Sequence, residues 1–321
     1  MRNHIEGWHR PLLGFSAAMG VLGLVSAVGL IVDDRTLVGS PIWHKPLKFS
    51  VSFVLYGLTL AWMHSLLTRG KRTSWWAGTV VAVASLLEMV VIVGQVMRGK
   101  RSHFNTETPL DETLFSLMGT TVVVLWLATL VMAVLLWRQK LADRAVMWAI
   151  RIGSAIALAG LGLGFLMTQP TDDQLAGRTT GTTGAHSVGV PDGGPHLPVT
   201  GWASTGGDLR IAHFVGMHAL QVLPLLALGL TFAARRYGWA ADTGVRPRLV
   251  LVAGAGYAGL VGLVTWQALR GQPLTSPDGA TLTAAAALAG AVAAAAGAVL
   301  ALRSRRPADR HREPAGAAAG G

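Results

Sequence analysis

Residues 75–97 read WWAGTVVAVASLLEMVVIVGQVM, an apolar run in which Glu88 is the single ionisable side chain. A helix rises about 1.5 Å per residue, so a run of this length covers the hydrocarbon core of a bilayer, which is about 30 Å thick. Lipid offers no hydrogen-bond partner to an open backbone, and a segment that crosses it must therefore be helical. The run predicts a transmembrane helix.

The chain contains eight runs of this kind, at residues 11–32, 49–67, 75–97, 114–137, 145–167, 211–234, 249–269 and 281–302. Of its 321 residues, 51% are hydrophobic and 13% are charged, which is typical of a polytopic membrane protein. We therefore predict an all-α membrane protein in which residues 1–302 form one domain, a bundle of eight transmembrane helices. The Arg-rich tail over residues 303–321 is predicted to be disordered and cytoplasmic.

The charges between the runs are sorted into two sets. Together, 17 Lys and Arg but only 5 Asp and Glu lie in the segments 1–10, 68–74, 138–144, 235–248 and 303–321. The alternating segments hold 9 Lys and Arg and 10 Asp and Glu, and they are 33–48, 98–113, 170–210 and 270–280. Basic residues near the ends of spans are retained in the cytoplasm, so both termini are predicted to face inward.

This sorting also explains the net charge of +11, which needs no nucleic-acid partner. The expected surroundings are the lipid bilayer, and the heavy use of Ala, Gly, Val and Arg points to a multi-pass protein of a bacterial inner (plasma) membrane. The chain has no cysteine, which excludes disulfides, iron–sulfur clusters and thiol catalysis. The long outer segment 170–210, between the fifth and sixth spans, has Gly/Pro turns and few charges. It predicts a folded cap over the outer end, with disorder as the alternative.

Glu88 lies about nine residues from the outer end of its span, roughly 13 Å deep by helical rise. An ionisable group at that depth is costly and marks a functional site by default. The alternative is a protonated carboxyl group that hydrogen-bonds across helices for structure. In the sixth span, His218 and Gln221 share one face at depths that bracket Glu88, so a Glu–His–Gln cluster is predicted. His213 diverges from His218 by about 140° around the axis, and no metal site is predicted.

Two outer helix mouths carry further polar groups. One holds His44, Lys45 and Lys48, and the other holds His103 and Asn105. Lysines on the outer side oppose the charge rule, which favours binding of a phosphate or carboxylate or, equally, snorkelling to lipid head groups. The same two alternatives apply to the bases after the third span, Arg98, Lys100 and Arg101.

These residues predict an outward-facing His/Glu-lined cavity that binds or transports a small anionic or lipid-derived ligand, with Glu88 and His218 as proton carriers. The alternative is a redox protein that holds a b-type haem between two histidines, such as His218 with His44 or His103. Intramembrane hydrolysis would need a metal or nucleophile constellation, which the sequence does not provide. Whether the protein is an enzyme, and which ligand or cofactor it takes, stay open.

Four motifs resemble a family of uncharacterised bacterial polytopic integral membrane proteins. They are PIWHKPLKFSVSFVLY at 41–56, RSHFNTETPLD at 101–111 with a following LMG, HSVGVPDGGPHLPVTGWASTGGDLR at 186–210, and HFVGMHALQ at 213–221. The similarity covers roughly residues 40–225 and implies the fold type and membrane location but no activity. Eight helices with inward termini are also similar to haem A synthase in outline. That family places haem-ligand histidines in its later helices, and residues 249–302 contain none.

Overall fold

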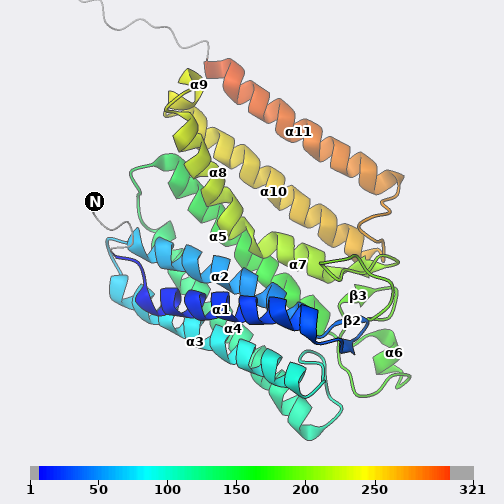
Figure 1. The fold of residues 1–321 in the computed structure, drawn as a ribbon. Helices are drawn as coiled ribbons and strands as arrows, with labels where there is room; N and C mark the ends of the chain where they lie inside the picture. Colours follow the sequence, from blue (N-terminus) through cyan, green and yellow to red (C-terminus); the bar gives the residue numbers. More distant parts are fainter. Residues whose placement is uncertain (1–6, 304–321) are drawn as a thin grey trace, which may run out of the picture.

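The computed structural model describes residues 7–303, so nearly all of the predicted disordered tail at 303–321 lies outside the described residues. The long helices lie side by side and run between the same two ends of the molecule (Figure 1). They are α1 (Arg10–Val32), α2 (His44–Ser65), α3 (Lys71–Met97), α4 (Pro109–Trp137), α5 (Arg144–Leu163), α7 (Leu209–Met217), α8 (Ala219–Ala233), α10 (Val245–Leu269) and α11 (Gly279–Arg303).

Seven of these helices are long and apolar enough to cross a membrane, and α7 with α8 makes an eighth if this bent pair is one span. The prediction of an all-α membrane bundle is confirmed at this level. Its smaller elements are the helices η1 (Gly164–Thr168), α6 (Asp172–Leu175) and α9 (Gly238–Ala241), and the strands β1 (Thr36–Leu37), β2 (Ser40–Pro41), β3 (Ser187–Val188) and β4 (Gly207–Asp208). The strands pair antiparallel, β1 with β2 and β3 with β4.

The helices form two groups, each with its own apolar core. The larger core joins α1, α2, α3 and α4 through residues such as Leu12, Leu60, Ile92 and Met132. The second joins α5, α7, α8 and α10. The groups meet where α2 packs on α8 and where α4 packs on α5.

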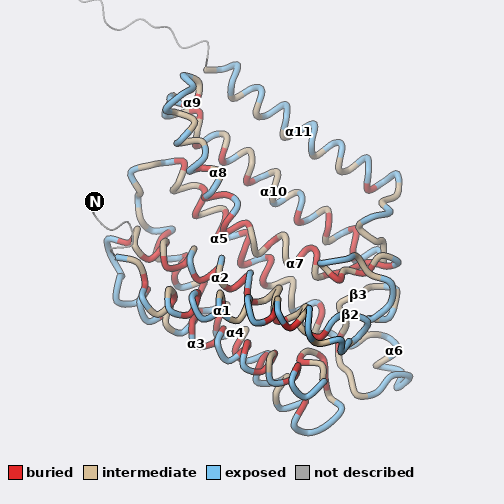
Figure 2. The backbone as a smooth tube through the Cα atoms, viewed as in Figure 1, coloured by how far each residue is buried: buried red, intermediate tan, exposed pale blue. Residues whose placement is uncertain are grey.

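The Ala-rich α11 lies at the edge of the bundle, against α10 (Figure 1). Leu288 and Val292 of α11 lie over Gly259 and Gly256 of α10, where a larger residue would leave no space. Small residues that let helices approach closely are common in membrane bundles. Most of the rest of α11 is exposed, as Figure 2 shows, which suits a helix that faces lipid on its other sides.

The two ends of the bundle differ in chemistry. We call the end that carries segments 33–48, 98–113, 170–210 and 270–280 the loop end, and the opposite end the basic end. The loop end, on the right in Figure 1, holds both strand pairs and α6. The long connection 170–208 is ordered there by its own turns and by backbone hydrogen bonds to neighbours, including Thr183 N–H to Phe104 O at 3.1 Å.

The helix starts follow local signals in the sequence. Thr108 caps α4 by accepting from the backbone N–H of Asp111, and Pro109 occupies the first turn. Asp143 caps α5 in the same way, through the N–H groups of Ala145 and Val146. The second span was predicted to begin at residue 49, but α2 begins at His44, because Pro46 suits a first turn and lets the helix start before the apolar run does.

The sixth span was predicted as one continuous helix over 211–234, and this is wrong in detail. The chain bends by 42° at His218, between α7 and α8. The Tyr257 hydroxyl of α10 donates to the Val215 carbonyl at 2.6 Å, an oxygen that a straight helix would offer to its own backbone. A side chain inserted into the backbone ladder is an established cause of such a kink.

Candidate functional site

Ion pairs neutralise most of the positive charge at the loop end. Of the nine Lys and Arg residues in its four segments, seven contact a carboxylate. The pairs are Arg35–Asp33, Arg98–Asp111, Lys100–Glu107, Arg101–Glu107, Arg178–Asp173, Arg210–Asp208 and Arg270–Asp278. The bases that follow the third span therefore need neither a bound anion nor snorkelling to explain them.

Lys45 and Lys48 are the exceptions. Both lie in the first turns of α2 and are half-buried, and neither forms an ion pair with any residue between 7 and 303. Lys45 Nζ donates to His103 Nδ1 at 3.0 Å, and Lys48 Nζ donates to the Thr200 carbonyl at 2.6 Å. Their ammonium groups thus have neutral partners, and their positive charge is left without a counter-ion in direct contact.

His103 forms the next wall of this region. Its ring lies edge-on to Phe49 at 5.9 Å and to Phe104 at 6.1 Å between centroids. Because Nδ1 accepts from Lys45, the proton of the neutral imidazole sits on Nε2. Burial lowers the pKa of His103 well below its usual value, and the nearby charge of Lys45 adds to this effect. His103 is therefore a neutral acceptor for Lys45 at ordinary pH.

His186 lies on the other side of Phe104, with the two ring centroids 4.8 Å apart. Its Nδ1 donates to Asp192 Oδ2 at 2.9 Å, and Asp192 also accepts from the backbone N–H groups of His186 and Ser187. Burial opposes ionisation of Asp192, but the hydrogen bonds from the His186 ring and from the two backbone N–H groups hold its pKa below the usual range. A carboxylate thus fixes the orientation and tautomer of His186.

Arg210 completes the group of charges. Its guanidinium pairs with the fully buried Asp208 and also donates to the Gly201 carbonyl at 2.6 Å. Asp208 accepts in addition from the Ala203 N–H. Arg210 lies within electrostatic range of both Lys45 and Lys48. We call Lys45, Lys48, His103, His186 and Arg210 the loop-end cluster.

Glu88 is buried, as the sequence predicts for a functional or structural carboxyl group at mid-depth, and is 2% exposed. It hydrogen-bonds to the Thr121 hydroxyl of α4 and lies within electrostatic range of Lys45. Thr121 has one hydroxyl proton and a second acceptor, the Met118 carbonyl at 2.9 Å. If that proton goes to Met118, as is common for threonine in a helix, a protonated Glu88 supplies the proton of the other bond.

In the structure, Glu88 does not hydrogen-bond directly to His218 or Gln221, the residues with which it was predicted to form a cluster. Among residues 7–303, no hydrogen bond or ring contact joins Glu88 to His218. His218 Nδ1 donates to Gln221 Oε1 at 3.2 Å, and Gln221 Nε2 donates to Thr59 Oγ1 of α2 at 3.3 Å. His218 and Gln221 therefore face the seam between the two helix groups, where Gln221 reaches α2.

His213 links His218 to the loop-end cluster. His213 lies within electrostatic range of His218, His186 and His103. Its Nδ1 donates to the Gly160 carbonyl of α5 at 2.8 Å, and its ring packs on Gly164. Through His213, His186 and Lys45, a series of polar side chains within electrostatic range of one another links His218 to Glu88.

His44 and Asn105 have more local roles. His44 begins α2 and lies within electrostatic range of Lys48 and His196. Asn105 is fully buried, where its side chain donates to the Arg101 carbonyl and accepts from the Glu107 N–H. It also pairs with Thr182 in an isolated strand bridge. Asn105 therefore fixes the connection that carries His103.

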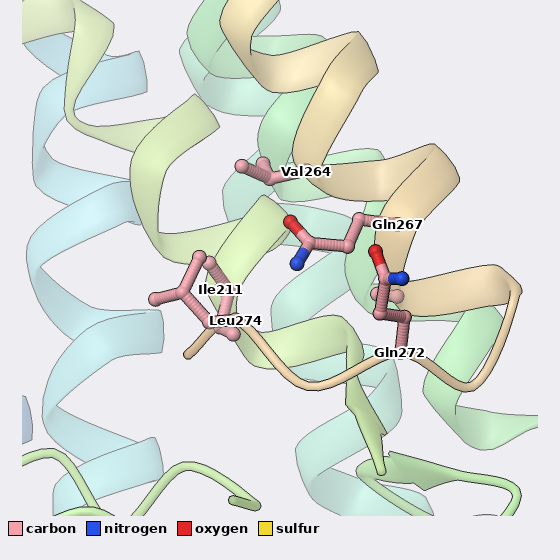
Figure 3. Close-up of a pocket in the computed structure, with 6 residues that line it drawn as sticks. Ile211, Val264, Gln267, Gln272 and Leu274 are labelled. Atoms are coloured by element: carbon pink, nitrogen blue, oxygen red, sulfur yellow. The ribbon is translucent and has the colours of Figure 1, made fainter. Parts of the chain in front are cut away.

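A shallow depression, too small to enclose a water molecule, lies between α7, α10 and the connection after α10 (Figure 3). It is lined by Ile211, Val264, Gln267, Ala268, Gln272 and Leu274. Gln267 donates to the Pro273 carbonyl and Gln272 accepts from Thr281, so both amides are used in holding that connection. The depression shares no residue with the predicted His/Glu-lined cavity, and that cavity stays a prediction.

Sequence reasoning missed the roles of Asp192 and Arg210. The signal was present in the motif HSVGVPD, since Gly and Pro between His186 and Asp192 allow the chain to turn back on itself. Arg210 is two residues from Asp208, and this spacing alone indicates a local ion pair at the surface. Only the path of the long connection brings Arg210 within electrostatic range of Lys45 and Lys48 on α2.

Comparison with protein-family models, curated proteins and solved structures finds no match to this chain. The resemblance stated above therefore stays a prediction, and the function has to be inferred from the loop-end residues themselves.

Proposed function

We propose that the protein binds a small oxyanion, a carboxylate or a phosphate, at Lys45 and Lys48 in the loop-end cluster. The observation that carries the proposal is the contrast in charge pairing. The other seven bases of the loop end contact a carboxylate, whereas these two half-buried ammonium groups do not. A bound anion is the natural counter-ion for them.

The free energy of desolvation supports this assignment. Removing an ammonium group from water costs on the order of several kcal/mol of free energy. The cost is offset only when a partner charge or a full set of hydrogen bonds replaces the water. Lys45 and Lys48 each donate one hydrogen bond, to His103 and to Thr200 respectively. Arg210 adds a third positive group within electrostatic range, partly offset by Asp208. An oxyanion between these groups would relieve their mutual repulsion.

We further propose that the loop end faces the outside of a bacterial plasma membrane, with both termini in the cytoplasm. The support is the excess of Lys and Arg in the basic-end segments, because basic residues near spans stay on the cytoplasmic side. The anion would then enter from outside. Transport of the same anion is an alternative use of this site, and uptake of labelled anion into proteoliposomes distinguishes transport from binding alone.

The test is calorimetric titration of the purified protein in nonionic detergent with sulfate, phosphate, acetate and glycerol 3-phosphate. We expect at least one to bind, and Lys45→Gln to weaken that binding by about tenfold to a hundredfold, since a charge-assisted hydrogen bond contributes about 1.5–3 kcal/mol. Lys100→Gln is the matched control, because Lys100 belongs to the same end of the bundle but is already paired with Glu107. Binding that is absent, or unchanged in Lys45→Gln, would refute the site.

A free anion and a lipid head group share this chemistry, and the membrane environment separates the two sources. In nanodiscs of phosphatidylcholine, a site for free anions should bind them with the affinity seen in detergent. In nanodiscs of phosphatidylglycerol, a site that holds a lipid phosphate would lose that affinity through competition. Equal affinity in both lipids assigns the site to a free anion.

A redox role stays a second candidate because of how the histidines are held. The Nδ1 atom of His186 donates to Asp192, that of His213 donates to the Gly160 carbonyl, and that of His218 donates to the Gln221 side chain. Histidines that bind haem or metal through Nε2 are commonly oriented in this way. An absorbance spectrum of the purified protein between 380 and 600 nm decides, since a Soret band would show a bound haem.

A further inference from the structure

We infer that binding of an oxyanion to the loop-end cluster is accompanied by uptake of one proton at Nε2 of His186. This rests on the proposed function and extends it, since the site would then take up the anion and a proton together, the components of a weak acid. The inference stands on the geometry of His186 with Asp192, within electrostatic range of Lys45 and Arg210.

The first step is the tautomer of His186. Its Nδ1–H donates to Asp192 Oδ2 at 2.9 Å, so the lone pair of the neutral ring lies on Nε2. Asp192 is itself held by the backbone N–H groups of His186 and Ser187. A carboxylate in this position stabilises the imidazolium that forms when Nε2 gains a proton. His186 is thus built to be a base.

The second step is the set of charges that face His186. Asp192 comes from its own connection, Lys45 from α2, Arg210 and His213 from α7, and His103 from the connection before α4. Burial is the main cause that lowers the pKa of His186, and the positive charges of Arg210 and Lys45 add to it, while Asp192 opposes them. With the cluster empty, His186 is therefore neutral around pH 7.

The third step is the effect of an anion. Arg210 and Lys45 are the cations that oppose protonation of His186, and Arg210 lies within electrostatic range of both lysines. A negative charge bound at Lys45 and Lys48 therefore offsets both cations, and the pKa of His186 rises when the anion binds. By linkage, a proton on His186 must strengthen anion binding to the same extent. The affinity for the anion then falls as pH rises, by up to about tenfold per pH unit for one coupled proton.

His103 and His213 are weaker candidates for this proton. Nδ1 of His103 already accepts from Lys45, and Nε2 carries its proton, so protonation would break the bond to Lys45. His213 has a lone pair on Nε2 but donates from Nδ1 to a neutral carbonyl, that of Gly160. His186 alone of the three has a carboxylate partner, as far as residues 7–303 are concerned.

The experiment counts protons. Sulfate is titrated into the intact protein at pH 7 by calorimetry in two buffers, PIPES and Tris, whose ionisation heats differ widely. Sulfate itself does not titrate near neutral pH, so a difference in binding heat between the buffers reports protons taken up by the protein. Acetate serves in the same way if it binds more tightly. For phosphate or glycerol 3-phosphate, the probe's own ionisation is subtracted.

We expect wild-type protein to take up close to one proton per anion, and His186→Gln to take up almost none and, by the same linkage, to bind the anion more weakly. Asp192→Asn should reduce the uptake, and His196→Gln, in the same connection but outside the cluster, should leave it unchanged. Equal heats in both buffers for wild type, or loss of uptake in His213→Gln but not in His186→Gln, would overturn the inference while leaving the anion site in place. If no anion binds in either buffer, the proposed function fails as well.

Discussion

Glu88 shows how a single proton decides the role of a buried carboxyl group. It reaches Thr121 of the neighbouring helix and lies in range of Lys45, so it is either a neutral hydrogen-bond donor or a distant counter-ion for the lysine. The Thr121 hydroxyl has one proton and two oxygen partners, Glu88 and the Met118 carbonyl. This favours the neutral, protonated form of Glu88, because Thr121 can then donate to Met118 while Glu88 donates to Thr121.

The two roles differ in what a substitution does. We expect Glu88→Gln to change the free energy of unfolding by less than about 0.5 kcal/mol, since an amide can donate to Thr121 as a protonated carboxyl group does. Glu88→Ala should lower it by about 1–3 kcal/mol, through the lost hydrogen bond and the space left behind. Unfolding in mixed micelles of increasing SDS fraction measures both. Equal loss in the two variants would instead mean that the negative charge itself is needed.

At the scale of the element, the crossing of α5 and α7 depends on two glycines. A Cβ on Gly216 would lie 2.6 Å from the Cα of Gly160, well inside van der Waals contact. The close approach also lets His213 reach the Gly160 carbonyl. The glycines therefore position a cluster residue as well as joining two helices.

This crossing gives a prediction with a control two residues away in the same helix. Gly160→Ala should force α5 and α7 apart and lower the free energy of unfolding by more than about 1 kcal/mol, the lower bound for overpacking a dense core. Gly162→Ala lies in the same helix with no atom within 4 Å of its added Cβ, and should be neutral or slightly stabilising. Thermal melts of the two variants in detergent compare them directly. A harmless Gly160→Ala would show that the helices separate in solution.

The same elements show where sequence reasoning ends. The apolar runs placed the spans to within a few residues, because length and hydropathy are properties of each segment alone. The bend at His218 was missed although Pro224, inside α8, is a helix-bending residue visible in the sequence; the Tyr257 hydroxyl that takes the Val215 carbonyl comes from another helix. Likewise, the depth of Glu88 followed from the run around it, but its partner Thr121 depends on how α3 and α4 pack.

For the candidate site, the sequence identified single groups and not their assembly. Lys45, Lys48 and His103 were picked out for opposing the charge rule or for lying at helix mouths, and they do lie together. Asp192 and Arg210 were passed over because they belong to a long connection whose path depends on tertiary contacts. Separations along the chain do not reveal such contacts.

At the scale of the whole molecule, the orientation is open to a direct test because the chain has no cysteine. Single cysteines at Thr73 and Gly244, at the basic end, should resist a membrane-impermeant thiol reagent in intact cells. A cysteine at Thr183, at the loop end, should react. Labelling after permeabilisation confirms that all three are accessible, and the reverse pattern in intact cells would invert the proposed topology.

The loop-end ion pairs carry a consequence for biosynthesis. Their partners are near neighbours in the chain, from two residues apart in Arg35–Asp33 to 13 in Arg98–Asp111. The basic-end pair Arg246–Asp143, by contrast, joins residues 103 apart and can form only after the bundle has assembled. In the proposed orientation, each loop-end pair can therefore close within a single hydrophilic segment as the translocation machinery passes it across the bilayer. Seven of the nine bases in the four loop-end segments would then cross paired with a carboxylate and offer little resistance to export. Lys45 and Lys48 are the two charges whose passage the insertion machinery must still accommodate.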